Sequence, residues 1–210
     1  MNLDGYIKRL KKKSKRNFII GITGSIGSGK SEVLSILNDN GFYTISSDEK
    51  VKKVLTNKKI CGKILIRYPE ASDRDGLLNK KKLALLVFKD NRAKIFIEGI
   101  IHPAVISEIL DEIKGKRNHL IAIEIPLLFE TGLDRAFNLN ITVVANEKIR
   151  VKRLIKRGMG LSDIKRRIKN QMADEIKIAS SDIVIYNNAS KEELKKEVCF
   201  LIGSIKKIMR

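Results

Sequence analysis

Residues 24–31 read Gly-Ser-Ile-Gly-Ser-Gly-Lys-Ser, which matches the phosphate-binding pattern G-x-x-x-x-G-K-S. Its glycines allow positive φ angles and bring backbone N–H groups close to an anion. In this pattern the lysine reaches the terminal phosphates and the serine hydroxyl binds Mg²⁺. We therefore expect a nucleotide site in which Ser31 is the metal ligand. The expected nucleotide-binding residues of this segment are Gly24, Ser25, Ile26, Gly27, Ser28, Gly29, Lys30, Ser31 and Glu32.

The residues on either side of this loop support the interpretation. An apolar run at 18–22 predicts a strand, and an apolar-periodic segment predicts a helix over 30–40 with Gly41 as its C-cap. Such a helix directs its positive N-terminal end at the same anion. The alternative is a glycine-rich turn with an incidental lysine, but such a turn would not need a strand before it and a helix after it.

Length and composition limit the remaining choices. The chain has 210 residues and a formal net charge of +19, with lysines spread along its whole length. A nucleic-acid-binding protein would explain that charge, but no nucleic-acid-binding motif accompanies it, so a compositional bias is the favoured interpretation. Cys61 and Cys199 have no C-x-x-C partner, and no apolar stretch is long enough to cross a membrane. We expect a cytoplasmic protein that is a monomer, with an oligomer left open, and no membrane or nucleic-acid partner.

Strand and helix patterns alternate along the chain, which predicts an α/β fold with a doubly wound parallel sheet of about five strands. The expected strands are 18–22, 42–45, 120–125, 139–145 and 183–186. Further helices are expected at 80–88, 103–113, 147–157, 161–178 and 191–208. The predicted organisation is a basic, disordered tail at 1–17, a core at 18–48 and 115–210 with a lid near 150–172, and an inserted helical lobe at 49–114.

Polar or special residues follow several of the predicted strands. Asp48, Pro126 and Asn187 lie, like the phosphate loop, at carboxyl ends of strands, where ligands of such sheets bind. Asp48 can orient an acceptor hydroxyl, although Ser46, Ser47 and Asp48 also suit a helix N-cap. We expect these positions to converge on one crevice.

Several classes of nucleotide-binding protein are excluded by missing motifs. The N-K-x-D sequence of GTPases does not occur, and neither does the signature of transporter ATPases. A small-molecule kinase with an acceptor lobe and an arginine-bearing lid remains. Arg153 and Arg157 lie four residues apart on one predicted helix and are candidates for clamping ATP phosphates, with surface charge as the alternative.

The chain resembles the dephospho-coenzyme A kinase family over about residues 18–200. The matching segments are 22–31, the Asp48 region, Asp75-Gly76-Leu77, Ile101-His102-Pro103, 125–130 (Ile-Pro-Leu-Leu-Phe-Glu), 167–171 (Arg-Ile-Lys-Asn-Gln) and 185–188 (Ile-Tyr-Asn-Asn). The resemblance implies a P-loop kinase fold and transfer of phosphate from ATP to the 3′-hydroxyl of dephospho-CoA. Another small-metabolite or nucleoside monophosphate kinase is the main alternative.

The resemblance also implies individual roles. Lys30, Asp48, Arg153 and Arg157 would be catalytic, and Asn187 and Asn188 would contact adenine. The expected acceptor-binding residues are Asp48, Lys52, His102, Pro126 and Leu127. The sequence departs from the family pattern in several places. Ser46 stands where an aspartate is usual, Lys52 where an arginine is usual, and Tyr186 and Ala189 where an aspartate and a glycine are usual, and the lid segment near 158–168 is slightly rearranged. Lysine keeps the charge at position 52 but loses the two-pronged geometry of arginine.

Overall fold

In the computed structural model, residues 3–117 and 119–208 are described, and they divide into two compact units. One unit comprises Ser47–Lys114 and the start of helix α1 (Leu3–Ser14); the other comprises Ile7–Ser46 and Gly115–Arg210. For comparison, the inserted lobe predicted from the sequence spans residues 49–114. Among the described residues, no helix has both the length and the apolar character needed to cross a lipid bilayer.

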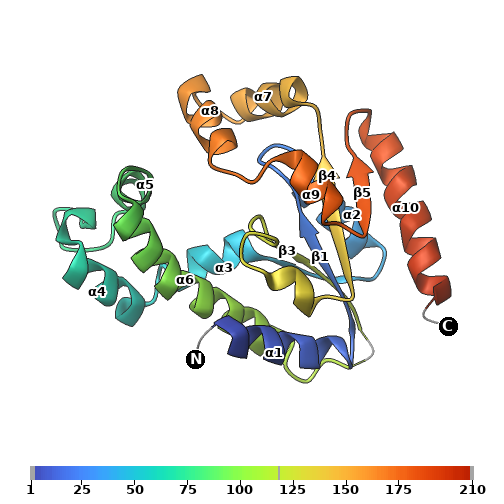
Figure 1. The fold of residues 1–210 in the computed structure, drawn as a ribbon, viewed down its shortest axis with the longest axis horizontal. Helices are drawn as coiled ribbons and strands as arrows, with labels where there is room; N and C mark the ends of the chain where they lie inside the picture. The colour runs from blue at the N-terminus through green and yellow to red at the C-terminus, as the bar shows by residue number, and fades with distance from the viewer. Residues whose placement is uncertain (1–2, 118, 209–210) are drawn as a thin grey trace. The chain divides into compact units, whose positions relative to one another are not determined.

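The second unit is built on a parallel sheet of five strands in the order β2-β3-β1-β4-β5 (Figure 1). The strands are β1 (Phe18–Thr23), β2 (Tyr43–Ser46), β3 (Leu120–Glu124), β4 (Leu139–Val144) and β5 (Ile183–Tyr186). Every pairing is parallel, so the carboxyl ends of all five strands lie at the same edge. The predicted doubly wound sheet is confirmed, and the segment after β1 lies at its centre.

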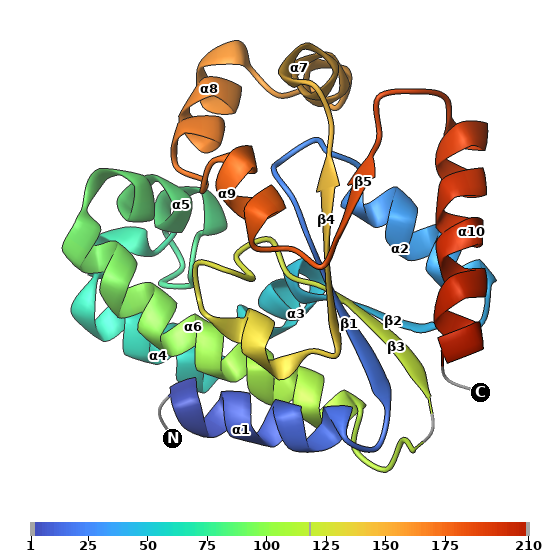
Figure 2. The same ribbon diagram turned by 45° about the vertical axis from the view of Figure 1, so that its right-hand side comes forward.

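Helices cover both faces of this sheet (Figure 2). Helices α2 (Lys30–Asp39) and α10 (Lys191–Ile208) pack on one face, where Val33, Leu37 and Val198 are fully buried. Side chains alternate along β4, so Thr142 points to the opposite face. There its hydroxyl donates to the carbonyl of Lys177 on α9 (Asp174–Ala179) at 3.4 Å. The central strands are therefore covered by helices on both faces, as is usual for a parallel sheet.

The helix predicted over 161–178 is wrong, because the chain forms two helices there. Helix α7 (Glu147–Lys156) is followed by α8 (Leu161–Lys169), and α9 begins only at Asp174. Asn170 ends α8, and Ala173 has extended backbone angles of φ −57° and ψ 146°. Asp174 then sits in the first turn of α9, where a negative charge is favourable. Residues 170–173 therefore lie outside a helix and can contact other parts of the chain.

The first unit contains α3 (Ser47–Val54), α4 (Lys58–Arg67), a 3₁₀ turn η1 (Pro69–Ala71), α5 (Lys80–Lys89) and α6 (Asn91–Glu112). The helix predicted to start at Pro103 instead begins at Asn91, with Pro103 inside it. The side chain of Asp90 caps this start by accepting from the N–H groups of Arg92 and Ala93. Buried apolar residues lie on both sides of the proline, from Ala93 to Leu110, and their packing offsets its lost hydrogen bond.

The expected disorder of residues 1–17 is also wrong for the described part of this segment, which forms α1. Leu10 is 1% exposed, so the helix has a buried side despite its run of lysines. Asn17 anchors the end of the segment by donating to the carbonyls of Lys13 at 3.3 Å and Lys116 at 3.2 Å and accepting from the N–H of His119 at 3.2 Å. A solvated lysine-rich face concealed this amphipathic helix in the sequence.

We predict that Leu10→Ala lowers the free energy of unfolding by about 2 kcal/mol or more, because it empties a buried leucine site. Chemical denaturation measures the change. Lys11→Ala, at the exposed neighbouring position, is the matched control and should change stability by less than about 0.5 kcal/mol. Equal stability of the two variants would show that α1 does not pack in solution.

Candidate functional site

Residues 24–29 connect β1 to α2 and have the backbone of a phosphate loop. Gly24, Gly27 and Gly29 adopt φ angles of 142°, 81° and 102°, which favour glycine. A Cβ atom at Gly24 would lie 2.2 Å from the Val143 carbonyl oxygen, and one at Gly29 would lie 2.0 Å from Nδ2 of Asn187. The loop is thus packed so tightly against the ends of β4 and β5 that side chains are excluded at both positions.

Lys30, the first residue of α2, folds back over this loop and is 8% exposed. Its Nζ donates to the carbonyl of Gly24 at 3.0 Å and to that of Ser25 at 3.4 Å. Oε1 of Glu124 lies 4.0 Å from the same atom. Because Glu124 pairs with Ile22 of β1 in the sheet register, its carboxylate reaches the loop from the end of the neighbouring strand. The ammonium is therefore oriented by loop carbonyls that phosphate oxygens can replace.

Ser31 and Glu32 follow in the first turn of α2, where the N–H of Glu32 donates to the carbonyl of the N-cap residue Gly29 at 3.0 Å. The Ser31 side chain belongs to an exposed residue, so its hydroxyl is accessible to a ligand. Glu32 forms an ion pair with Nζ of Lys191 at 3.3 Å. No group of three or more His, Cys, Asp or Glu side chains suited to a metal is found in the described ranges. A cation here would therefore depend on the serine hydroxyl together with phosphate and water oxygens.

The residue after β5 is bonded directly to the loop. Nδ2 of Asn187 donates to the Ser28 carbonyl at 2.8 Å, and Asn187 is 5% exposed. Arg153 of α7 donates to the carbonyl of Ser28 at 3.3 Å, and to both the backbone and side-chain oxygens of Asn187 at 3.2 Å. The Asn188 side chain accepts from the N–H of Asn146 at 2.7 Å. Arg153 is thus half-buried in a polar network around the loop, and the alternative of plain surface charge does not describe it.

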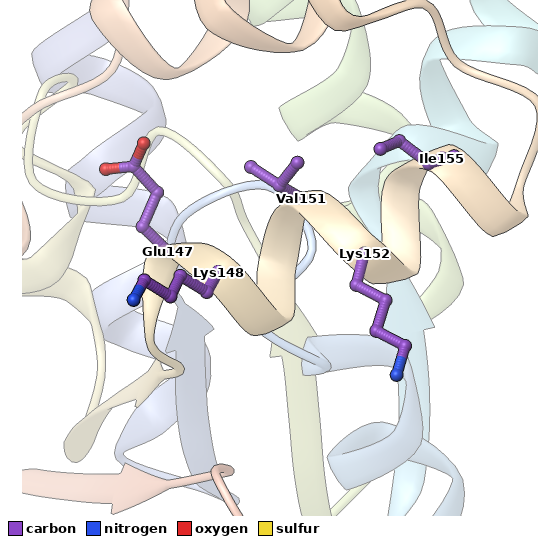
Figure 3. Close-up of a pocket in the computed structure, with 5 residues that line it drawn as sticks. All are labelled: Glu147, Lys148, Val151, Lys152 and Ile155. Atoms are coloured by element: carbon purple, nitrogen blue, oxygen red, sulfur yellow. The ribbon is translucent and has the colours of Figure 1, made fainter.

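Helix α7 presents two different faces. Arg150, Arg153 and Leu154 face the phosphate loop and the core, whereas Arg157 caps the helix end and is exposed. A shallow hollow lies on the opposite face (Figure 3). It is lined by Glu147, Lys148, Val151, Lys152 and Ile155. Since one helix supplies the whole lining, we assign this hollow no role.

Sequence reasoning missed the residues that bind the outer part of the loop. Oγ of Ser25 donates to Oδ1 of Asp174 at 2.5 Å, and Nη2 of Arg150 lies 3.2 Å from Oδ2 of the same carboxylate. The N–H of Ile26 donates to Oε1 of Gln171 at 2.9 Å. The assumption of one helix over 161–178 hid Asp174, and the spacing of Arg150 three residues before Arg153 was the available signal.

A second ion pair supports α9 beneath the loop. Lys177 is fully buried, and its Nζ lies 3.3 Å from Oε1 of Glu130. Glu130 ends the Pro-Leu-Leu-Phe-Glu segment that follows β3. At the start of this segment, the Pro126 carbonyl accepts from Oγ1 of Thr23, the last residue of β1, at 3.1 Å. Leu127, the next residue, uses its carbonyl to accept from the Thr131 hydroxyl at 2.7 Å.

The remaining predicted residues belong to the other compact unit. Helix α3 begins at Ser47, so Asp48 is its exposed second residue and not its N-cap. Lys52 follows one turn later on the same helix. His102 lies within α6, where burial lowers the pKa of its imidazole below the ordinary value and keeps the ring neutral at pH 7. Their roles toward an acceptor stay predictions.

A five-stranded parallel sheet of this order, with a glycine-rich loop and a buried lysine between β1 and α2, defines the class of P-loop kinases. Comparison with known proteins identifies the family, because the family model for dephospho-CoA kinase matches residues 18–193. The chain belongs to the dephospho-CoA kinase family.

Individual relatives agree with this assignment. A dephospho-CoA kinase of Corynebacterium glutamicum is 35% identical over 192 residues, which cover 89% of this chain and 98% of the relative. A crystal structure from Thermus thermophilus has a TM-score of 0.81 at 32% identity and covers 90% of this chain and 98% of its own. The dephospho-CoA kinase from Campylobacter jejuni has a TM-score of 0.69 at 27% identity, covering 92% of this chain and 100% of its own.

We predict that Gly29→Ala weakens nucleotide binding at least about tenfold, because the added methyl group meets Asn187 and the φ angle of 102° is strained. Titration with ADP, followed by calorimetry, measures the affinity. Gly203→Ala is the matched control, since nothing lies within 4 Å of that position on α10. It should raise stability by about 0.5–1 kcal/mol and leave affinity unchanged. Normal ADP affinity in Gly29→Ala would contradict the tight packing of the loop.

Proposed function

We propose that this protein transfers the γ-phosphoryl group of ATP to the 3′-hydroxyl of the ribose of dephospho-CoA, giving CoA and ADP. Membership in the family supports the reaction. The single structural observation that carries it is the buried Lys30 ammonium, which donates to the Gly24 and Ser25 carbonyls of the phosphate loop. The resemblance to relatives in two acceptor segments, at His102-Pro103 and Pro126-Leu127, points to dephospho-CoA as the acceptor.

The phosphate loop binds and orients ATP. Backbone N–H groups at the start of α2 donate to phosphate oxygens, and the positive end of the helix favours the negative charge. Lys30 exchanges its carbonyl contacts for β- and γ-phosphate oxygens and neutralises charge as the phosphoryl group moves. Asn187 at the end of β5 and Arg153 of α7 hold the loop in this shape. Arg157, which is exposed at the C-terminal end of α7, clamps the ATP phosphates in this proposal.

The residues present fit Mg²⁺. This ion usually keeps several waters and takes only one or two protein ligands, so an accessible Ser31 hydroxyl beside the phosphates is a suitable donor. Glu124, buried at the end of β3, is positioned to hold a water molecule near the loop. When bound, Mg²⁺ supplies charge neutralisation between the phosphate oxygens.

Asp48 orients the acceptor hydroxyl and accepts its proton in this proposal, while Lys52 and His102 contribute to acceptor binding. An exposed carboxylate directly after β2 is accessible to a substrate, which supports the assignment. His102 is neutral, so it contributes shape or a hydrogen bond and no charge. We further propose that the protein acts as a monomer in the cytoplasm, where free thiols such as Cys61 and Cys199 stay reduced.

A coupled assay of ADP release tests the reaction. Dephospho-CoA should support rapid ADP release, whereas AMP, CMP and other nucleoside monophosphates should not. Rapid turnover with a nucleoside monophosphate and none with dephospho-CoA would replace this proposal with another kinase activity.

We predict that Lys30→Ala lowers kcat at least about a hundredfold, the scale of a lost electrostatic contact in a transition state. Lys195→Ala, which removes a lysine from the exposed side of α10, is the matched control and should keep full activity. Steady-state kinetics and melting temperatures of both proteins provide the comparison. A folded Lys30→Ala enzyme with nearly normal kcat would exclude the loop mechanism.

We also predict that Asp48→Asn lowers kcat by about 10²-fold to 10⁴-fold with little change in ATP affinity, because asparagine cannot accept the hydroxyl proton. The neighbouring Glu49→Gln removes the same charge from the first turn of α3 and serves as the control. If Asp48 acts only through the helix dipole, both variants should lose about 0.3–1 kcal/mol of stability and keep their turnover. Turnover of Asp48→Asn within a few-fold of the parent enzyme would remove Asp48 from the mechanism.

A further inference from the structure

The outer end of the phosphate loop is attached to two helices through one carboxylate. Asp174 accepts from the Ser25 hydroxyl at 2.5 Å and pairs with Arg150 of α7 at 3.2 Å. Ser25 is 4% exposed and Arg150 is 6% exposed, while the Asp174 side chain is 19% exposed, so the contacts are largely but not fully shielded from water. We call Ser25, Arg150 and Asp174 the loop clasp. It joins the loop, α7 and α9 within one compact unit.

The buried guanidinium of Arg150 needs the negative charge of Asp174 to compensate it. Nε of Arg150 is buried without a hydrogen-bond partner among the described residues, so the guanidinium depends on Asp174 for compensation. Breaking a buried ion pair on one side leaves an uncompensated charge, which is strongly unfavourable. The carboxylate is consequently fixed in place, and it fixes the Ser25 hydroxyl in turn.

The position of Ser25 matters for the nucleotide because its carbonyl faces the inside of the loop. That oxygen accepts from the N–H of Ser28 at 3.1 Å and from Nζ of Lys30 at 3.4 Å. Ser25 is thus bonded to the clasp by its side chain and to the phosphate-binding lysine by its backbone. Gln171 restrains the next residue by accepting from the N–H of Ile26 at 2.9 Å.

We propose that Asp174 is a positioning residue that holds the phosphate loop in its nucleotide-binding shape through Ser25, and this inference rests on the proposed function. Asp174 touches no reacting atom. It sets the placement of the Ser25 carbonyl, and through it the orientation of Lys30 before ATP arrives. Loss of the clasp loosens the loop and weakens the binding of the nucleotide, while the binding of the acceptor is unaffected.

Whether Asp174→Asn binds the nucleotide more weakly or more tightly distinguishes a positioning role from a purely electrostatic one. Removing a negative charge near a phosphate site favours phosphate binding through space. Positioning predicts the opposite result, since Asp174→Asn disturbs the loop and weakens binding. Ser25→Ala removes only the hydroxyl, changes no charge, and should weaken binding in the same direction.

A double-mutant cycle on ADP affinity tests the proposal, with Ser25→Ala, Asp174→Asn and the double variant. Each single variant should bind ADP about fivefold or more weakly, and the double variant should resemble Asp174→Asn alone. The KM for ATP should rise in parallel, and the KM for dephospho-CoA should stay within about twofold of the parent value. Glu175→Gln, which removes the adjacent exposed carboxylate of α9, is the matched control and should bind ADP normally.

Three results would overturn the proposal: tighter ADP binding by Asp174→Asn, single effects that multiply in the double variant, or affinities of both single variants within twofold of the parent. Should Asp174→Asn fail to fold, Arg150→Gln replaces it in the cycle, because it removes the buried charge together with its ion pair. Failure of the parent protein to bind ADP would instead reject the proposed function. Normal binding by the parent with no coupling between the sites rejects only the role of Asp174.

Discussion

The hydrogen bond from the Asn187 side-chain amide to the Ser28 carbonyl, at 2.8 Å, is the contact on which the site depends. It draws the middle of the loop against the end of β5 so closely that residue 29 has no room for a Cβ atom. With that contact in place, the loop turns back toward β1 and Lys30 meets the carbonyls of its own loop. The same carbonyl also accepts from Arg153 at 3.3 Å, so two donors offset the desolvation cost that an unpaired buried carbonyl would carry.

The protein supports the loop with polar groups drawn from distant parts of the chain. Asn187 acts from the end of β5, Arg153 from α7, the Asp174 carboxylate from α9, and Gln171 from the segment before α9. Most of these bonds end on backbone atoms of the loop. A loop that must bind a highly charged ligand is thereby ordered in advance, which lowers the entropy cost of binding.

Local sequence patterns predicted the sheet and the loop because both depend on residues that are close together in the sequence. The apolar runs specify buried parallel strands, and the spacing of Gly24, Gly29 and Lys30 specifies a phosphate loop. The clasp could not be predicted in this way, since Ser25, Arg150 and Asp174 meet only after the sheet has formed. Helix boundaries failed where tertiary contacts outweighed local preference, as at Pro103 and between α8 and α9. The burial of Leu10 could likewise not be predicted from its own lysine-rich segment, because it depends on contacts with other parts of the chain.

The burial of Lys177 beside Glu130 makes this lysine react differently from the exposed lysines of the chain. Many other lysines of this basic chain, such as Lys11 and Lys195, are exposed to water, where amine-directed reagents and acetylating enzymes can reach them. Lys177 is fully buried on α9, so its amine can react only when that helix moves away from β4. Its rate of modification therefore reports how often this part of the nucleotide-binding unit opens, in a protein whose many other lysines react regardless of folding.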